Sequence, residues 1–346
     1  MAAMILRPRF LFIADAGPQV GGGHVMRSLT LAKALIERGA LCVFLATPEV
    51  RALLEVFGPD MPREDATAAD AAHIADAVTG IEFDAVVFDH YGLSRAEHEE
   101  VAQGRPTLVI DDLANRPLEA DLVLDSGPAR QAQDYAGMTP PGALLLLGPS
   151  HAPVRPAFPA LREAALARRA AGGPVRRILI SLGLTDVGGI TGRVVDLLLP
   201  QLGDIALDVV TGGGALSLPR LRALEDPRLA LHVDTQDMPR LTLEADLAIG
   251  AGGSSSWERC ILALPTLTLI LADNQIAVVK ALAEAGASTC LDASSADFEV
   301  AFGQKIDQLI VEGALRATLS AASAQLCDGD GARRVAAAFL ARIAAS

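Results

Sequence analysis

The chain has 346 residues, which is too long for one typical hydrophobic core and fits two domains of ordinary size. Its apolar fraction of 51% supplies side chains for two cores, although aromatic residues make up only 4%. The net charge of −13 argues against nucleic acid or an anionic membrane surface as a partner, because binding to either depends on excess Lys and Arg.

No run approaches the roughly 20 apolar residues that span a bilayer, and the best run, residues 261–272, contains Pro265. The first residues lack the cleavage pattern of a signal peptide, so the sequence predicts a cytoplasmic protein without stable membrane insertion. The four cysteines are far apart and form no C-x-x-C motif, which favours reduced core thiols over a disulfide scaffold or a structural zinc site. They are Cys42, Cys260, Cys290 and Cys327.

Short apolar runs alternate with helical patterns through the first half of the chain, which predicts a parallel sheet with helical crossovers. Between the first two predicted strands, apolar residues recur at helical spacing from Met26 to Ile36, and Gly39 ends that helix. This is one β-α-β unit, and it predicts an α/β fold class. The predicted strands are residues 10–14, 41–46, 85–89, 107–111, 122–125 and 144–147.

A change in composition between residues 148 and 174 indicates a domain boundary, because its prolines cannot continue a sheet ladder. We predict an N-terminal domain at 1–155, a C-terminal domain at 156–330 and a terminal helix at 331–346 that could pack back on the N-terminal domain. Two such domains facing each other would form a cleft at the carboxyl ends of their parallel sheets, where open α/β folds bind ligands. The second series of predicted strands is residues 177–182, 206–211, 229–233, 247–250 and 266–271, with closing helices from residue 297 onward.

Three consecutive glycines at 21–23 bring His24 and Arg27 to the start of the first predicted helix. Exposed backbone N–H groups there can hold an anion while the imidazole faces it. The segment 14–29 is no P-loop, since no Gly-Lys-Ser/Thr follows, and position 26 breaks the dinucleotide pattern, which disfavours a nicotinamide cofactor. A plain strand-to-helix turn is the alternative. Because His24 and Arg27 are three residues apart and share a helix face, we favour a functional role.

Polar side chains also follow the strand predicted at 85–89, in the segment Phe-Asp-His-Tyr-Gly at 88–92. The carboxyl end of a parallel strand is where such a sheet places its ligand. We therefore favour a functional role for Asp89 and Tyr91, although Asp89 could merely cap the next turn and Tyr91 could merely pack on the loop. For His90 the functional and structural readings stay open.

In the second half, a strand runs into Gly-Ala-Gly-Gly-Ser-Ser-Ser-Trp-Glu at 250–258. Glycines free the backbone, and serine hydroxyls with amides open a helix, which makes a diphosphate cradle without lysine. Glu258 falls within the first helical turns, where its carboxylate could take two ribose hydroxyls. The alternative roles, Ser254 or Ser255 as a helix cap and Glu258 as a complement to the helix dipole, are compatible with binding.

The last candidate is Asp273-Asn274-Gln275, directly after the strand predicted at 266–271. Asn and Gln carry donors and acceptors suited to hydroxyl or acetamido groups. Helix capping by Asp273 or Asn274 would be the better interpretation of this segment alone. Its place at the carboxyl end of a strand strengthens the functional interpretation.

Together, these four segments resemble the UDP-2,4-diacetamido-2,4,6-trideoxy-β-L-altropyranose hydrolases of pseudaminic acid biosynthesis, a pathway that supplies surface or flagellin glycosylation. The resemblance rests on His-Val-Met-Arg at 24–27, Asp-His-Tyr at 89–91, Gly-Gly-Ser-Ser-Ser-Trp-Glu-Arg-Cys at 252–260 and Asp-Asn-Gln at 273–275, and it covers nearly the whole chain. The family is similar in fold to the GT-B glycosyltransferases, including the one that adds N-acetylglucosamine in peptidoglycan synthesis. The resemblance implies two Rossmann-like domains, with UDP held mainly by the C-terminal one.

The resemblance also implies residue roles. His24 would be the general base that activates water, with Gly22 and Gly23 bringing the backbone close to the sugar. Arg27, Asp89 and Tyr91 would lie on the sugar side, and Asn274 and Gln275 would contact the nucleotide sugar. The loop of Gly252, Gly253, Ser254 and Ser255 would bind the diphosphate, Glu258 the ribose and backbone at Met238 the uracil. The family usually shows Gly-Gly-Ser-Asp after the first C-terminal strand, where this chain has Gly183, Leu184, Thr185 and Asp186, and Thr185 could replace the serine hydroxyl.

The chemistry fits these residues, because a histidine can be a neutral base at cytoplasmic pH and UDP is a good leaving group. We therefore predict inverting hydrolysis of a UDP-sugar to UDP and free sugar, with no cofactor and no metal. A glycosyltransferase of the same fold and a non-catalytic nucleotide-sugar-binding protein are the alternatives. The sequence leaves the exact sugar and the oligomeric state open.

Overall fold

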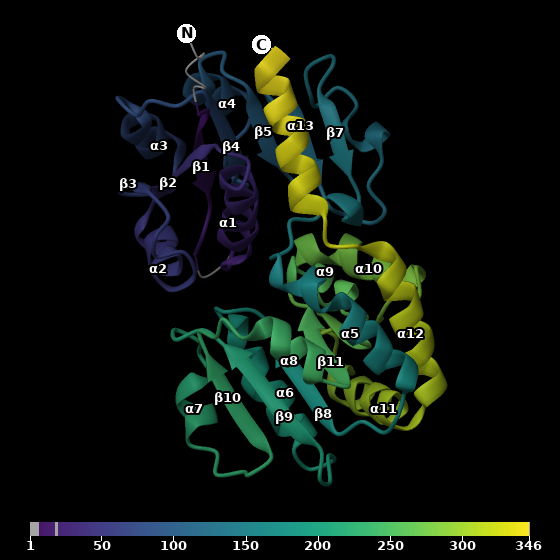
Figure 1. Ribbon diagram of the computed structural model, residues 1–346. Helices are drawn as coiled ribbons and strands as arrows, with labels where there is room; N and C mark the ends of the chain where they lie inside the picture. The colour runs from purple at the N-terminus through teal and green to yellow at the C-terminus, as the bar shows by residue number, and fades with distance from the viewer. Residues whose placement is uncertain (1–6, 18–19, 346) are drawn as a thin grey trace. The chain divides into compact units, whose positions relative to one another are not determined.

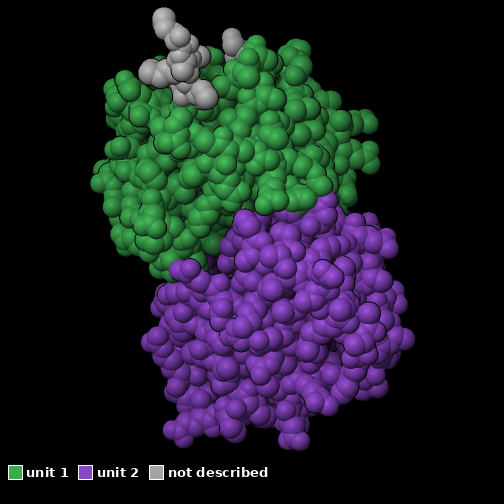
Figure 2. Space-filling view, viewed as in Figure 1, with its two compact units in different colours: residues 1–153, 330–346 green, residues 154–329 purple. Residues whose placement is uncertain are grey.

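The computed structural model of the protein describes residues 7–17 and 20–345, so residues 18 and 19 of the loop before His24 lie outside it. The chain forms two compact units, coloured separately in Figure 2. Unit 1 comprises Met1–Pro153 and Asp330–Ser346, and unit 2 comprises Val154–Gly329. The chain therefore enters unit 2 at Val154 and returns to unit 1 at Asp330.

Unit 1 is built on a seven-stranded parallel sheet with the order β3-β2-β1-β4-β5-β6-β7 (Figure 1). The strands are β1 Arg9–Ala14, β2 Leu41–Ala46, β3 Arg63–Asp65, β4 Ala85–Asp89, β5 Thr107–Ile110, β6 Leu122–Asp125 and β7 Leu144–Leu147. The α-helices are α1 Gly23–Ile36, α2 Pro48–Phe57, α3 Ala71–Val78, α4 Arg95–Ala102 and α13 Gly331–Ala345, and the 3-10 helices are η1 Ala132–Tyr135 and η2 Pro149–His151.

Helices cover both faces of this sheet, and β1 shows why. Successive side chains of a strand point to opposite faces, so Phe10 and Phe12 join the cluster under α1, α2 and α13, while Leu11 joins the cluster under α3 and α4. Phe339 of α13 packs edge-on against Phe10, with ring centroids 5.2 Å apart. Gly331 starts α13, and a Cβ there would lie 2.2 Å from the carbonyl oxygen of Ala152. The C-terminal helix is thus part of the unit 1 core.

Unit 2 is built on a six-stranded parallel sheet with the order β10-β9-β8-β11-β12-β13. The strands are β8 Arg177–Ser181, β9 Ala206–Thr211, β10 Leu229–Val233, β11 Leu247–Ala251, β12 Thr266–Ile270 and β13 Thr289–Asp292. The α-helices are α5 Ala157–Ala171, α6 Ile190–Leu198, α7 Leu218–Arg222, α8 Met238–Glu244, α9 Ser255–Ile261, α10 Ile276–Glu284, α11 Phe298–Val311 and α12 Gly313–Leu326. The 3-10 helices are η3 Val187–Gly189 and η4 Asp273–Gln275.

The predicted α/β fold class, with two parallel-sheet, Rossmann-like halves, is confirmed. Two strands were missed, and each lies at a sheet edge. The β3 strand is the charged triplet Arg-Glu-Asp, which has no apolar run to signal a strand, and β13 is only four residues long and half-buried. The first helix begins at Gly23, so His24 and Arg27 both lie in the first turns of α1, as the sequence predicted.

Candidate functional site

The candidate residues of unit 1 gather where three neighbouring strands end. Strands β1, β4 and β5 are adjacent and parallel, so the residues that follow them share one edge of the sheet. Asp15 follows β1, Asp89 ends β4, and Asp112 comes soon after β5. The first turn of α1 brings His24 to the same place, since His24 lies 3.7 Å from Asp89.

His24 is buried, with 5% of its surface exposed. Its Nδ1 is 3.7 Å from Oδ1 of Asp89, which is too far for a hydrogen bond, and that nitrogen has no partner. The imidazole packs edge-on against the Tyr91 ring, with centroids 4.5 Å apart and planes at 90°. Burial lowers the pKa of His24 below its ordinary 6.5, because Asp89 only partly offsets the loss of hydration. The ring is therefore neutral at physiological pH and able to accept a proton.

Asp89 is fully buried and held by α1. Its carboxylate accepts hydrogen bonds from Nε and Nη2 of Arg27 at 2.7 and 2.6 Å and from Oγ of Ser28 at 3.1 Å. The bidentate pair neutralises both charges inside the protein. Arg27, which the sequence placed on the sugar side, therefore has its donors directed at carboxylates within unit 1 and only 8% of its surface exposed.

Asp112 is a further member of this site that sequence reasoning missed. It accepts hydrogen bonds from the Tyr91 hydroxyl at 2.6 Å and from Nη1 of Arg27 at 2.9 Å. Burial opposes its charge, but Arg27 and the Tyr91 hydroxyl outweigh that effect and lower the pKa of Asp112 below its ordinary value. Asp112 thereby fixes the ring that packs on His24. Its position just after a strand, like that of Asp89, was the signal that could have revealed it.

His90 lies beside this group, with 6% of its surface exposed. Its Nδ1 accepts a hydrogen bond from the Gly92 amide at 3.0 Å, so the neutral ring carries its proton on Nε2. That Nε2 makes no hydrogen bond and lies 3.9 Å from Oδ2 of Asp15. Burial lowers the pKa of His90, while Asp15 and the Ala69 carbonyl oppose the shift. His90 is thus a second neutral imidazole at the same edge.

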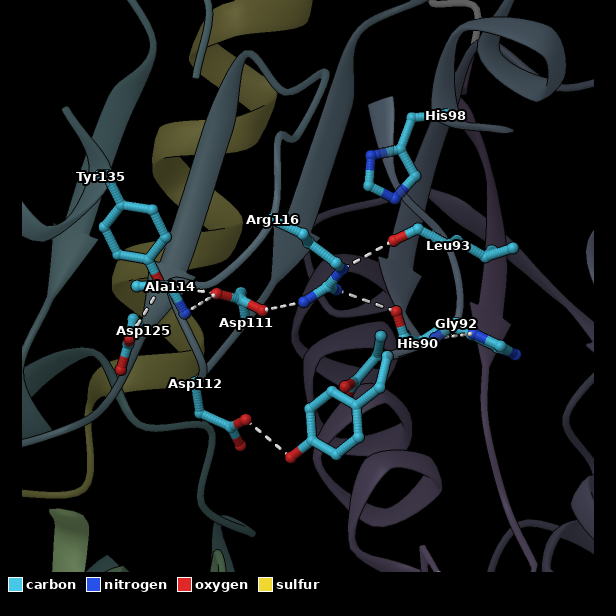
Figure 3. A network of polar contacts seen from close by, with 12 residues as sticks. His90, Gly92, Leu93, His98, Asp111, Asp112, Ala114, Arg116, Asp125 and Tyr135 are labelled. Atoms are coloured by element: carbon cyan, nitrogen blue, oxygen red, sulfur yellow. Dashed lines mark hydrogen bonds and ion pairs between the residues drawn. The ribbon is translucent and has the colours of Figure 1, made fainter. Parts of the chain in front are cut away.

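A buried polar network holds the loop that carries Tyr91 (Figure 3). Arg116 donates to Asp111 at 2.7 Å and to the carbonyl oxygens of Leu93 and His90 at 2.8 and 3.0 Å. Asp111 also accepts from the Tyr135 hydroxyl at 2.9 Å, and burial raises the pKa of Tyr135. Since every charge in the network has a partner, the loop is fixed on both sides of Tyr91.

The candidate residues of unit 2 follow β8, β10, β11 and β12. After β11, the loop 252–254 leads into α9 at Ser255. A Cβ on Gly252 would lie 2.2 Å from the Val279 side chain, so the close packing of this loop requires glycine there. The Gly252 amide donates to Oε1 of Gln275 at 3.3 Å, and the same oxygen accepts from the Leu271 amide at 3.1 Å. Gln275 therefore ties the loop to the end of β12, and exposed Asn274 lies next to it.

Glu258 forms an ion pair that the sequence did not reveal. Nε and Nη2 of Arg155 lie 2.9 and 2.8 Å from the same oxygen, Oε1 of Glu258. Within residues 7–17 and 20–345, Oε2 has no hydrogen-bond partner, although the side chain is only 16% exposed. This arrangement leaves one carboxylate oxygen of Glu258 able to accept hydrogen bonds from hydroxyl groups. Arg155 was assigned to a linker because it stands among prolines.

The loops after β8 and β9 are joined by a buried aspartate. Asp186 accepts hydrogen bonds from the amides of Thr191 and Ser217, both at 2.8 Å. Half-buried Thr185 precedes it, and Gly183 has a φ of +107°, a conformation that favours glycine. Met238 is half-buried at the start of α8, beyond the end of β10. The predicted site residues thus form two groups, one at the carboxyl edge of each sheet.

Residues 7–17 and 20–345 contain neither a candidate metal cluster nor a helix that could span a membrane. No cluster of three or more His, Cys, Asp or Glu side chains in that part of the chain is arranged to hold a metal ion. None of its helices is long and apolar enough to cross a membrane.

No protein-family model matches the chain. The Bacillus subtilis spore coat polysaccharide biosynthesis protein SpsG is 25% identical over 342 residues, which cover 94% of this chain and 95% of that protein. The UDP-2,4-diacetamido-2,4,6-trideoxy-beta-L-altropyranose hydrolase of Campylobacter jejuni is 23% identical over 280 residues, which cover 80% of this chain and 97% of the hydrolase.

Solved structures share the fold. MurG of Acinetobacter baumannii has a TM-score of 0.67 at 20% identity, over 96% of this chain and 99% of MurG. The spinosyn rhamnosyltransferase SpnG has a TM-score of 0.66 at 17% identity, over 98% of this chain and all of that one (100%). The chain therefore has the fold of the GT-B glycosyltransferases.

Proposed function

We propose that the protein is an enzyme that hydrolyses a UDP-sugar, with His24 as the general base. The observation that carries this proposal is the neutral, buried imidazole of His24, held between Asp89 and Tyr91 at the carboxyl edge of the sheet. Its Nδ1 is buried 3.7 Å from Asp89 and makes no hydrogen bond within the described part of the chain, so we assign the proton transfer to Nε2. The nearby carboxylate favours the protonated ring through its charge, as a general base requires.

The proposed reaction is a single displacement. Nε2 of His24 takes a proton from water while the water oxygen bonds to the anomeric carbon. The bond from that carbon to the UDP oxygen breaks, and UDP leaves with the bonding electrons, so the configuration inverts. Asp89 stabilises the imidazolium that forms, and the paired Arg27 keeps Asp89 ionised and in place. Because UDP is a good leaving group, amide and hydroxyl donors suffice to stabilise it.

We assign the nucleotide to the residues of unit 2. Backbone and hydroxyl groups of Gly252, Gly253, Ser254 and Ser255 would hold the diphosphate. The unpaired oxygen of Glu258 would accept ribose hydroxyl groups. Backbone at Met238 would contact the uracil, and Asn274 and Gln275 after β12 would contact the nucleotide sugar. Gly183 and Thr185 lie after β8.

We assign the sugar to the residues of unit 1. Gly22 and Gly23 precede His24 directly, so their backbone can approach the sugar without a side chain in the way. Tyr91 and Asp89 would line the same side, and Arg27 acts as a positioning residue through its bonds to Asp89 and Asp112. The name of the C. jejuni relative and the four shared motifs support a 2,4-diacetamido-2,4,6-trideoxy hexose as the sugar, in pseudaminic acid biosynthesis.

A glycosyltransferase with a UDP-sugar donor is the second candidate, and the likeness to MurG and SpnG favours it. In that case a hydroxyl of an acceptor would take the place of water, and His24 would deprotonate the acceptor. The two functions differ in one observable, the release of UDP in the absence of any acceptor.

The test is an assay of UDP release by the purified protein against a panel of UDP-sugars, without an acceptor, for wild type and His24→Ala. We expect wild type to release UDP from a diacetamido sugar nucleotide and the variant to be inactive. Release of UDP only when an acceptor is added would establish the transferase instead. Equal biological activity of wild type and His24→Ala would point to a binding protein and contradict catalysis.

A further inference from the structure

Arg259 in α9 is a buried cation without an anionic partner. Its side chain is 4% exposed, and its hydrogen bonds go to Oγ of Ser255 at 3.0 Å, the Ala251 carbonyl at 2.8 Å and Oγ of Ser256 at 3.1 Å. All three acceptors are neutral, and no carboxylate of the described residues lies within ion-pair distance. Burial lowers the pKa of Arg259 to about 10, as expected for a charge that has lost its hydration without gaining a counter-ion.

Arg169 shows how this chain otherwise accommodates such a side chain. It bonds to the carbonyl oxygens of Thr242, Leu243 and Ala245, which end α8, where a positive charge is favourable. Arg259 instead extends toward the N-terminus of its own helix. Its acceptors are three to eight residues earlier in the chain, at the end of β11 and in the first turn of α9, where the helix dipole does not favour a positive charge. Hydrogen bonding alone therefore does not account for the charge at this place.

The backbone is shaped to admit this guanidinium. A Cβ on Gly250 would lie 2.4 Å from Cζ and 2.5 Å from Nη1 of Arg259, so the side chain lies against the bare backbone of β11. Glycine inside a strand often marks such a close approach. The guanidinium therefore lies between the backbone of β11 and the loop from Ala251 to Ser256, with which it forms its hydrogen bonds.

The hydrogen bonds also set the direction of one hydroxyl group. Oγ of Ser255 accepts from Arg259, so its own proton must point away from the guanidinium. Ser256 directs its proton to the Ala251 carbonyl at 3.3 Å, whereas Ser255 has no such acceptor among the described residues. Because Ser255 is partly exposed, its O–H is available to a ligand on the outer side of the loop, polarised by the charge behind it.

We propose that Arg259 is a positioning residue that gives the loop 251–256 its affinity for a phosphate or diphosphate group, through its charge and through the hydroxyl of Ser255. The seven-residue α9 contributes little by its own dipole, so a full charge behind the loop is the larger source of attraction. The anion supplies the missing counter-charge and takes the Ser255 proton as a hydrogen bond. This inference rests on the proposed nucleotide site in unit 2.

The test is titration calorimetry of the full chain with uridine, UMP, UDP and inorganic pyrophosphate. Arg259→Gln removes the charge, Arg259→Lys keeps the charge but not the fork of donors, and Ser255→Ala removes the hydroxyl at a partly exposed position. We expect Arg259→Gln to weaken UDP binding by at least about tenfold and Ser255→Ala by about fivefold, with uridine binding within about twofold of wild type. Arg259→Lys should lie between wild type and Arg259→Gln.

Arg169→Gln is the matched control, because it removes a half-buried arginine whose hydrogen bonds go to carbonyl oxygens. It should lower thermal stability and leave the ratio of UDP to uridine affinity unchanged. An unchanged ratio of UDP to uridine affinity in Arg259→Gln and Ser255→Ala, or an equal loss of uridine and UDP affinity in these variants, would overturn the role of Arg259. Pyrophosphate binding to wild type without binding of any uridine compound would keep the anion site and refute the proposed nucleotide function.

Discussion

The two sheets present the same kind of edge, but their charges are arranged in opposite ways. In unit 1, the carboxylates of buried Asp89 and half-buried Asp112 share Arg27, so each of these charged groups has a partner of opposite sign before any ligand arrives. In unit 2, Arg259 is buried with neutral acceptors only, and Glu258 keeps one oxygen without a partner. A site whose charged side chains are paired with one another keeps its geometry without a ligand, as proton transfer requires. A site with an unpaired charge can gain the missing partner from its ligand.

The largest expected effect is on the rate of UDP release, with little change in the affinity for UDP. Replacing His24 with Ala removes the proposed base and should lower the rate of UDP release by about 10²–10⁴-fold. The affinity for UDP should stay close to that of wild type, because the proposed nucleotide contacts belong to unit 2. Rates and calorimetric affinities measured on the same preparation check this. A parallel loss of rate and UDP affinity would contradict the assignment of the base to unit 1 and of the nucleotide contacts to unit 2.

Asp89→Asn should break the bidentate ion pair between Arg27 and Asp89 in unit 1. It leaves Arg27 buried with Asp112 as its one remaining carboxylate, and breaking such a pair costs about 3–5 kcal/mol of unfolding free energy. Urea denaturation measures the loss. Glu82→Gln, at an exposed ion pair with Arg9, is the matched control and should change stability far less. Similar losses of stability for both variants would contradict the claim that the buried Arg27–Asp89 pair matters more to stability than an exposed ion pair.

Glu258→Gln should reveal whether Oε2 of Glu258 accepts a hydrogen bond from the ribose. If that oxygen binds a ribose hydroxyl, the variant should weaken UDP binding by about five- to tenfold and weaken 2′-deoxy-UDP binding much less. Calorimetry with the two nucleotides measures the difference. Equal weakening of both would show that Glu258 acts only through its ion pair with Arg155.

The smallest expected effect is a shift in the pH profile. The base must be neutral to act, so kcat/KM should rise with pH through the pKa of His24, which burial places below its ordinary 6.5. Asp89, Asp112 and Asp15 raise that pKa and Arg27 lowers it, while the Tyr91 ring packs on the imidazole. Asp112→Asn should therefore move the acid limb to lower pH, by less than about one unit. A shift to higher pH would contradict the assignment of this limb to His24.

The sequence predicted the regular elements well where apolar runs are long and buried. Strands such as β4 and β9 were expected with their observed bounds, since their burial on both faces demands continuous apolar residues. The charged edge strand β3 carries no such signal. Position after a strand also indicated Asp89 and Tyr91, which do lie at the carboxyl edge.

The partners of the site residues could not be predicted in the same way. Arg27 and Asp89 are 62 residues apart, and Arg155 and Glu258 are 103 apart, so their pairing depends on how the sheets assemble. Asp112 stood beside a predicted strand end and was not distinguished from Asp111. In the sequence, Arg259 was one residue of the motif at 252–260 and had no assigned role, because burial without a counter-ion can be seen only in the folded chain.

Hydrolysis in oxygen-18 water, followed by mass spectrometry of both products, tests most directly whether water attacks the anomeric carbon of the sugar. We predict that the label enters the free sugar and that UDP carries none, since the bond formed is the one between water oxygen and the anomeric carbon. Label in UDP would place the attack at phosphorus and contradict the proposed mechanism.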